Sequence, residues 1–243
     1  MHIEYVYMDD EQRQRPNPTP SNHVADAPST LESAESYVSR SKGTDCESHG
    51  SREAFKASFA ALYDWGQAVG LIRYENEFHF FSRLPEGSGD EHEAWFDESC
   101  NRWFKATYPN KFGLAWGRLG SATAGEYLTR LVFQNQYFGD DIQLVAIVDS
   151  KQEMRVVTSQ PHIPGTPAPA EEIRMWFQGL GFTRFECNGS AAWYRKPDNL
   201  LAADAHEGNV IKTTEGVLFA IDLNLIKPKG EMRAAVLGLL EPT

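Results

Sequence analysis

Three side chains in the C-terminal part of the sequence have the types and spacing that phosphoryl-transfer chemistry needs. Asp204 and Asn209 are five positions apart in one polar segment, and Asp222 follows Asn209 by 13 positions. An aspartate can orient the proton of an attacking hydroxyl, an asparagine oxygen can bind a metal ion, and a second acid can hold a metal that bridges phosphates. Strands over residues 210–212 and 217–221 would form a hairpin that returns Asp222 to Asn209. We therefore predict that these side chains converge on one site.

The spacing admits other interpretations. The pattern D-x-x-x-x-N is that of a kinase catalytic loop, but Asp204 and Asn209 capping an ordinary turn would explain it equally well from spacing alone. The apolar strand directly before Asp222 favours the catalytic interpretation. His206 supports an alternative of another class, a metal-dependent hydrolase that uses Asp204, His206 and Asp222.

A partner for the phosphates is expected upstream of this segment. Three short aromatic-rich runs separated by polar turns predict an antiparallel meander over residues 78–84, 92–96 and 101–108. Lys105 lies on the third run, and the periodicity of residues 123–138 predicts a helix directly after it, with Glu126 in its first turn. Gly87 and Gly89 lie between the first two runs, where a glycine-rich phosphate loop would be.

Each of these upstream residues also has an ordinary structural explanation. A strand lysine such as Lys105 commonly lies in solvent at a sheet edge, and Glu126 is favourable at a helix start whatever its function. A G-x-G sequence is a common hairpin turn. Asp90 and Glu91, beside the glycines, would repel a phosphate unless their side chains point away.

The order of elements predicts an α+β fold. Residues 9–50 are polar with few apolar positions, and we expect a disordered tail over residues 1–50. Residues 51–157 are predicted to contain a leading helix, the meander, the helix over 123–138 and two further strands. A proline-rich crossing then leads into residues 158–243, with another helix and short strands around Asp204.

Composition excludes several classes of function. The chain has 243 residues and a formal net charge of −11, so we expect no nucleic-acid partner. Its three cysteines are widely spaced, which argues against a disulfide framework and a cysteine zinc site. We find no apolar run of 18 residues and no signal peptide, and therefore expect a cytoplasmic protein without a membrane partner.

Several segments together resemble the Ser/Thr/Tyr kinase domain found in bacterial polyvalent proteins, the multi-domain proteins of phages and conjugative elements. The resemblance covers about residues 55–226. It is carried by Phe112-Gly113, Glu126-Tyr-Leu128, Gln134-Asn135, Phe138-Gly-Asp-Asp141, Thr158-Ser-Gln-Pro161, Gly181-Phe182, Asp204-Ala-His-Glu-Gly-Asn209 and Ile221-Asp222. Its most specific pieces are 138–141, 158–161 and 204–209.

The resemblance implies a reduced, two-lobed protein-kinase-like fold, with an antiparallel β-rich N-lobe and a small C-lobe. It implies an ATP- and Mg²⁺-dependent phosphotransferase whose partners are a nucleotide and a hydroxyl acceptor. By this resemblance Asp204 is the catalytic base, and Asn209 and Asp222 are the Mg²⁺ ligands. Lys105 would bind the α- and β-phosphates with Glu126 as its partner, and Gly87 and Gly89 would form the phosphate loop. Ser159 and Gln160 would lie in a hinge whose backbone groups meet adenine.

The sequence also departs from the eukaryotic kinase pattern. Ala202-Ala203 replace His-Arg before the catalytic aspartate, His206 replaces a lysine, and Leu223-Asn224 follow Asp222 in place of Phe-Gly. Only 21 residues follow Asp222, which leaves no room for an activation loop and a full helical lobe. These departures support a second alternative, a pseudokinase-type interaction module, and they leave the acceptor open among proteins, nucleotides and small molecules.

Overall fold

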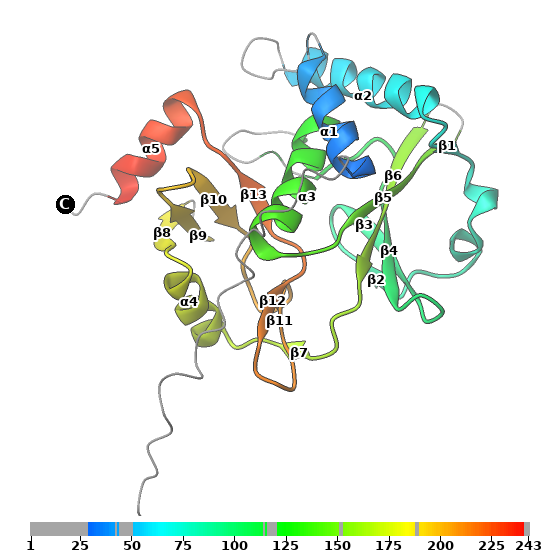
Figure 1. Cartoon of the computed structure of the whole chain (residues 1–243). Coiled ribbons are helices and arrows are strands. Elements are labelled where there is room, and N and C mark those ends of the chain that lie inside the picture. The colour runs from blue at the N-terminus through cyan, green and yellow to red at the C-terminus, as the bar shows by residue number, and fades with distance from the viewer. Residues whose placement is uncertain are drawn as a thin grey trace, which may run out of the picture.

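The computed structural model describes residues 29–41, 43, 51–113, 115, 121–150, 153–187 and 190–240. They form an α+β fold, as predicted, and their strands make three separate sheets. Figure 1 shows the largest sheet on one side of the molecule, helix α3 near its middle, and the C-terminal strands and helices on the other side. Within the described residues no helix is both long and apolar enough to cross a membrane.

The largest sheet carries the candidate site and has the strand order β1-β5-β6-β4-β3-β2. Its strands are β1 (Ile72–Arg73), β2 (Gly87–Ser88), β3 (His92–Asp97), β4 (Arg102–Thr107), β5 (Gln143–Ser150) and β6 (Glu153–Pro161). Strands β2, β3 and β4 form an antiparallel meander. β1 pairs with β5 in parallel, so the sheet is mixed and differs at this edge from the predicted antiparallel arrangement.

The first strand of the meander differs from the prediction. Residues 78–84 contain no strand; short 3₁₀ helices occupy Glu75–Glu77 and His79–Ser82 instead. The phenylalanines of this segment cover one face of the sheet, where Phe80 packs on Trp95 and Phe104. An aromatic-rich segment can thus cover a sheet as readily as extend it, because both placements bury the rings.

Helices cover the other face of the sheet. They are α1 (Thr30–Arg40), α2 (Ser51–Ala68) and α3 (Ala124–Phe138), whose apolar faces share one core with Leu144, Met154 and Val156. The helix predicted over 123–138 is confirmed as α3. Thr123 is its N-cap, and the Thr123 and Glu126 side chains form a reciprocal capping box.

Helix α1 corrects the prediction of a disordered tail over residues 1–50. Ser29 and Glu32 form a capping box at its start, and Leu31, Ala34 and Val38 are buried against α2 and α3. The Thr129 hydroxyl of α3 also donates to Glu35, at 2.8 Å. The prediction also covers residues 1–28, 42 and 44–50, which lie outside the described residues.

Two smaller sheets and two helices follow β6. Their elements are β7 (Thr166–Pro167), α4 (Ala170–Gly179), β8 (Thr183–Cys187), β9 (Ser190–Arg195), β10 (Leu200–Ala203), β11 (Val210–Lys212), β12 (Leu218–Ala220), β13 (Asn224–Ile226) and α5 (Gly230–Leu240). The sheet β13-β10-β9-β8 contributes to one core with α4 and to another with α5. The hairpin expected before Asp222 is present as β11 and β12, and β11 also pairs with β7.

A substitution in α1 tests whether this helix belongs to the folded core. Leu31→Ala removes a side chain that is 1% exposed, so we expect the free energy of unfolding to fall by about 2–5 kcal/mol in urea denaturation. Val69→Ala, at a position that is 53% exposed, is the control and should have little effect. An equally small effect of Leu31→Ala would contradict the packing of α1 on α3.

Candidate active site

The structure brings Lys105 and Asp222 together. The Lys105 Nζ lies 3.6 Å from Asp222 Oδ2 and donates a longer hydrogen bond, 3.4 Å, to the carbonyl of Ile221. His92 Nε2 lies 3.5 Å from the same Asp222 oxygen. Burial raises the pKa of Asp222, but the charges of Lys105, His92 and Arg130 outweigh it and hold this pKa below its ordinary value. Asp222 is therefore an ionised carboxylate at neutral pH.

Strand register directs Lys105 towards this site. Lys105 pairs with Ala94 of β3 on one side and Thr158 of β6 on the other, and directly paired residues share a face of the sheet. Its side chain is 17% exposed, so it is no solvent lysine at a sheet edge. The Lys105 ammonium thus points to the face that α3 and the segment 220–223 cover.

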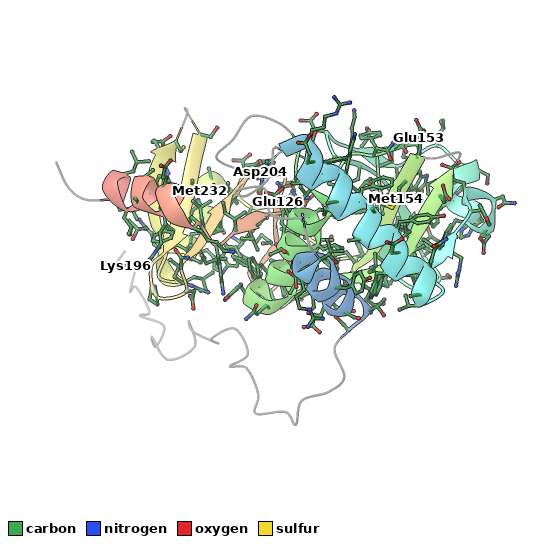
Figure 2. The ribbon with its side chains drawn as sticks, turned by 90° about the horizontal axis from the view of Figure 1, so that it is seen from above. Glu126, Glu153, Met154, Lys196, Asp204 and Met232 are labelled. Carbon is green, nitrogen blue, oxygen red and sulfur yellow. The ribbon has the colours of Figure 1, made fainter. Side chains whose placement is uncertain are left out.

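The loop between β10 and β11 holds Asp204 and Asn209 close together. Asn209 Nδ2 donates to the Asp204 carbonyl at 2.9 Å and to its carboxylate at 3.0 Å. Asp204 has a left-handed backbone, with φ of 63°, which costs energy for a residue with a side chain and often marks functional sites. Figure 2 places Asp204 between Met232 of α5 and Met154 of the large sheet.

His206 contributes to the order of this loop. Its Nδ1 accepts from the Gly208 N–H at 2.9 Å, so Nε2 carries the proton and lies 3.3 Å from Asp204 Oδ1. A Cβ on Gly208 would stand 2.8 Å from the His206 ring, so a side chain there would require this ring to shift. His206 therefore holds the Asp204 carboxylate from one side while Asn209 holds it from the other.

The hairpin β11–β12 connects this loop to Asp222. Val210 pairs with Ala220, and the Ile221 N–H donates to the Asn209 carbonyl at 2.9 Å. The structure thus contains two pairs of predicted residues: Lys105 with Asp222, and Asp204 with Asn209. The backbone hydrogen bond between Ile221 and Asn209 connects the pairs. Of the four, only Lys105 and Asp222 line the pocket at this site, so the convergence of all four side chains stays a prediction.

Other predicted site residues lie elsewhere. Glu126 caps α3 through its bond to the Thr123 N–H at 2.7 Å, and Lys105 is paired with Asp222. Ser159 and Gln160 lie inside β6, where the Ser159 backbone pairs with both β4 and β5. The predicted hinge at 158–161 therefore lies within strand β6, which runs to Pro161, and the predicted domain boundary at 157/158 falls inside the same strand.

Gly87 and Gly89 lie in the β2–β3 hairpin. Gly87 belongs to β2 opposite Ala94, and the Gly89 N–H donates to the His92 carbonyl at 3.1 Å. A Cβ on Gly89 would meet no atom within 4 Å, so packing alone does not require a glycine there. Their role in phosphate binding stays a prediction.

The metal-hydrolase alternative receives no support from the geometry. Over the part of the chain that the structure describes, no three His, Cys, Asp or Glu side chains are grouped closely enough to hold a metal ion. That part includes Asp204, His206 and Asp222. His206 contacts Asp204, whereas Asp222 contacts Lys105 and His92. A three-ligand site of these residues is therefore not formed.

The family comparison agrees with this geometry. Residues 86–226 match the model of the serine/threonine/tyrosine kinases found in polyvalent proteins, a range that is more than half of the chain and contains β2 to β13. The chain belongs to this family. It is accordingly a kinase-like phosphotransferase, and α1, α2 and β1 precede the matched range. No curated protein and no solved structure matched.

This kinase also contains a buried ion pair that the sequence did not reveal. Arg130 of α3 is 6% exposed; its Nη1 donates to Glu91 Oε1 at 2.9 Å and its Nη2 to Glu91 Oε2. Gly113 makes room for Glu91, since a Cβ there would lie 1.9 Å from the carboxylate. Glu91 thus turns away from the glycine segment, and it fastens the end of that segment to α3.

We expect Glu91→Ala to lower the free energy of unfolding by about 3–5 kcal/mol, because it leaves the buried Arg130 charge without its carboxylate. Urea denaturation followed by circular dichroism measures this loss. Glu171→Ala, which removes an exposed ion pair with Arg174, is the control and should change stability little. If Glu91→Ala proves as mild as the control, the pair does not fasten α3.

Proposed function

We propose that this kinase transfers the γ-phosphoryl group of ATP to a hydroxyl acceptor with the help of Mg²⁺. Asp204 orients the acceptor hydroxyl, Lys105 binds phosphate oxygens, and Asp222 with Asn209 supplies the metal ligands. The observation that carries the proposal is the Lys105–Asp222 ion pair, at 3.6 Å, connected through Asn209 to Asp204. Phosphoryl transfer needs such a set of positioned charges more than covalent chemistry.

The donor atoms suit a magnesium ion. Mg²⁺ prefers oxygen ligands and usually takes one or two protein ligands together with phosphate oxygens and water. Asp222 offers an ionised carboxylate, and Asn209 turns its amide nitrogen to Asp204, which directs its carbonyl oxygen elsewhere. A two-ligand site of this kind also agrees with the lack of a three-ligand cluster among the described residues.

The nucleotide site is narrow in this structure. A pocket of about 10 Å³, lined by His92, Lys105, Arg130, Gln134 and Asp222 among others, has space for roughly one water molecule. Triphosphate binding therefore requires that Lys105 separate from Asp222. We propose that the six-stranded sheet with α3 acts as the N-lobe and the residues after Pro161 as the C-lobe, and that opening between them admits the nucleotide.

The acceptor remains open among proteins, nucleotides and small molecules. Asp204 is 60% exposed at its side chain, so an acceptor of any of these classes can reach it. The narrow pocket is the observation that favours the pseudokinase alternative, in which the domain binds a partner without turnover. Transfer measurements separate the two functions.

Purified protein incubated with radiolabelled ATP and Mg²⁺ tests the proposal. We expect Asp204→Ala to lower transfer to an acceptor, to the protein itself or to water by about 10²-fold or more, while nucleotide binding changes little. Asp222→Asn should weaken Mg²⁺-dependent nucleotide binding, because it removes charge from a metal ligand. Asp64→Asn, an exposed position on α2, is the matched control.

The outcomes discriminate clearly. Binding of Mg-ATP without transfer to any acceptor would favour the pseudokinase function. Absence of ATP binding would contradict both functions. Equal loss of nucleotide binding in Asp204→Ala and Asp222→Asn would contradict the division of roles between the two aspartates.

A further inference from the structure

Two glutamines and an aspartate hold the backbone directly before Asp222. Gln134 of α3 donates from Nε2 to the Ala220 carbonyl at 2.7 Å, and Gln160 of β6 donates from Nε2 to the Ile221 carbonyl at 2.9 Å. Gln134 and Gln160 are 2% and 4% exposed. Consecutive carbonyls of one segment are thus bound by side chains from a helix and a strand.

Asp140 organises both glutamines. Its Oδ2 accepts from Gln160 Nε2 at 2.5 Å and, more weakly, from Gln134 Nε2 at 3.4 Å, while its Oδ1 accepts from the Asp141 N–H. Each carboxamide therefore directs one hydrogen to Asp140 and the other to the segment 220–221. Burial raises the pKa of Asp140, and the hydrogen bonds from Asp141 and Gln160 oppose that rise because they favour the carboxylate.

We propose that Gln134, Asp140 and Gln160 form a carboxamide latch that positions Asp222 for phosphoryl transfer. This inference rests on the proposed function of Asp222 as a metal ligand. Asp222 is followed here by Leu223, which is buried, and by β13, so no Phe-Gly pair follows the aspartate. Through the latch, α3 and β6 both bind the segment 220–221. These hydrogen bonds fix the backbone next to the Asp222 carboxylate.

The latch also gives a role to Gln134 and Asp140, which belong to segments that carry the family resemblance but have no role assigned by it. Gln134, Asp140 and Gln160 come from three separate quoted segments, and the structure gathers them at one point. The expected contact of Gln160 with adenine is through its backbone, whereas its carboxamide binds Asp140 and Ile221. These are positioning residues, since each acts on Asp222 through the backbone of 220–221 and none contacts its carboxylate.

Local hydrogen exchange tests the latch without nucleotide. Gln134→Met and Gln160→Met keep an unbranched side chain of similar length and remove the donors. We expect amide exchange in residues 218–224, including Ile221, to accelerate by about 10-fold in each variant. Gln136→Met, at an exposed position of the same helix, is the control and should leave this exchange unchanged.

The Mg²⁺ dependence of transfer supplies a second readout that general destabilisation would not move. The latch variants should need about 10-fold more Mg²⁺ for half-maximal transfer, with circular dichroism and thermal midpoints showing folded protein at the assay temperature. Asp140→Asn, which keeps the shape but removes the charge, should shift both readouts in the same direction and by less.

The results for the latch and for the proposed function are distinguishable. A wild type without any transfer would count against the proposed function, and exchange alone would then decide the latch. Unchanged exchange at 218–224 in both glutamine variants overturns the latch. If the wild type is active, the latch is also overturned when the glutamine variants exchange faster but need no more Mg²⁺ for half-maximal transfer.

Discussion

The site depends on the ion pair between Lys105 and Asp222, two residues 117 positions apart in the sequence. One partner is fixed by the pairing of β4 between β3 and β6, and the other by the hairpin β11–β12 and the segment after it. Because both charges are largely withdrawn from water, their attraction is stronger than that of a surface pair, but each also loses hydration. Neighbouring groups must therefore hold both in place.

Helix α3 is the element that supplies most of this support. One side packs on α1 and α2, where apolar burial stabilises it, and another side presents Arg130 to Glu91 and Gln134 to Ala220. The same helix thus connects the glycine segment, through Glu91, with the backbone before Asp222. Glu126 caps α3, and the ion pair that fastens this helix to the sheet has the opposite arrangement to the expected one: the base, Arg130, is on the helix, and the acid, Glu91, precedes strand β3.

The local elements were predictable and most of the long-range contacts were not. The periodicity of α3 and the hairpin before Asp222 are local signals, and the structure agrees with them. Helix α1 was missed because a short helix with few apolar residues is stable only through partners distant in sequence. Arg130–Glu91 and the latch around Asp140 were missed for a related reason, since no spacing rule joins residues on separate elements.

Under the proposed function, this structure is a closed arrangement in which Lys105 and Asp222 satisfy each other's charges before a nucleotide and a metal ion bind. Asp222 neutralises Lys105 where a phosphate would, and Lys105 holds Asp222 where a metal ion would. Exchange of these partners conserves the number of opposite-charge contacts, so it costs far less than exposing either charge unpaired in the site. The latch confines this exchange of partners to side chains, because it holds the carbonyls of Ala220 and Ile221. The Asp222 carboxylate can then turn from the Lys105 ammonium to a metal ion while its backbone stays fixed. Nucleotide entry then requires the proposed opening between the six-stranded sheet and the residues after Pro161, together with separation of the Lys105 and Asp222 side chains, while Glu91 keeps the end of the glycine segment anchored to α3.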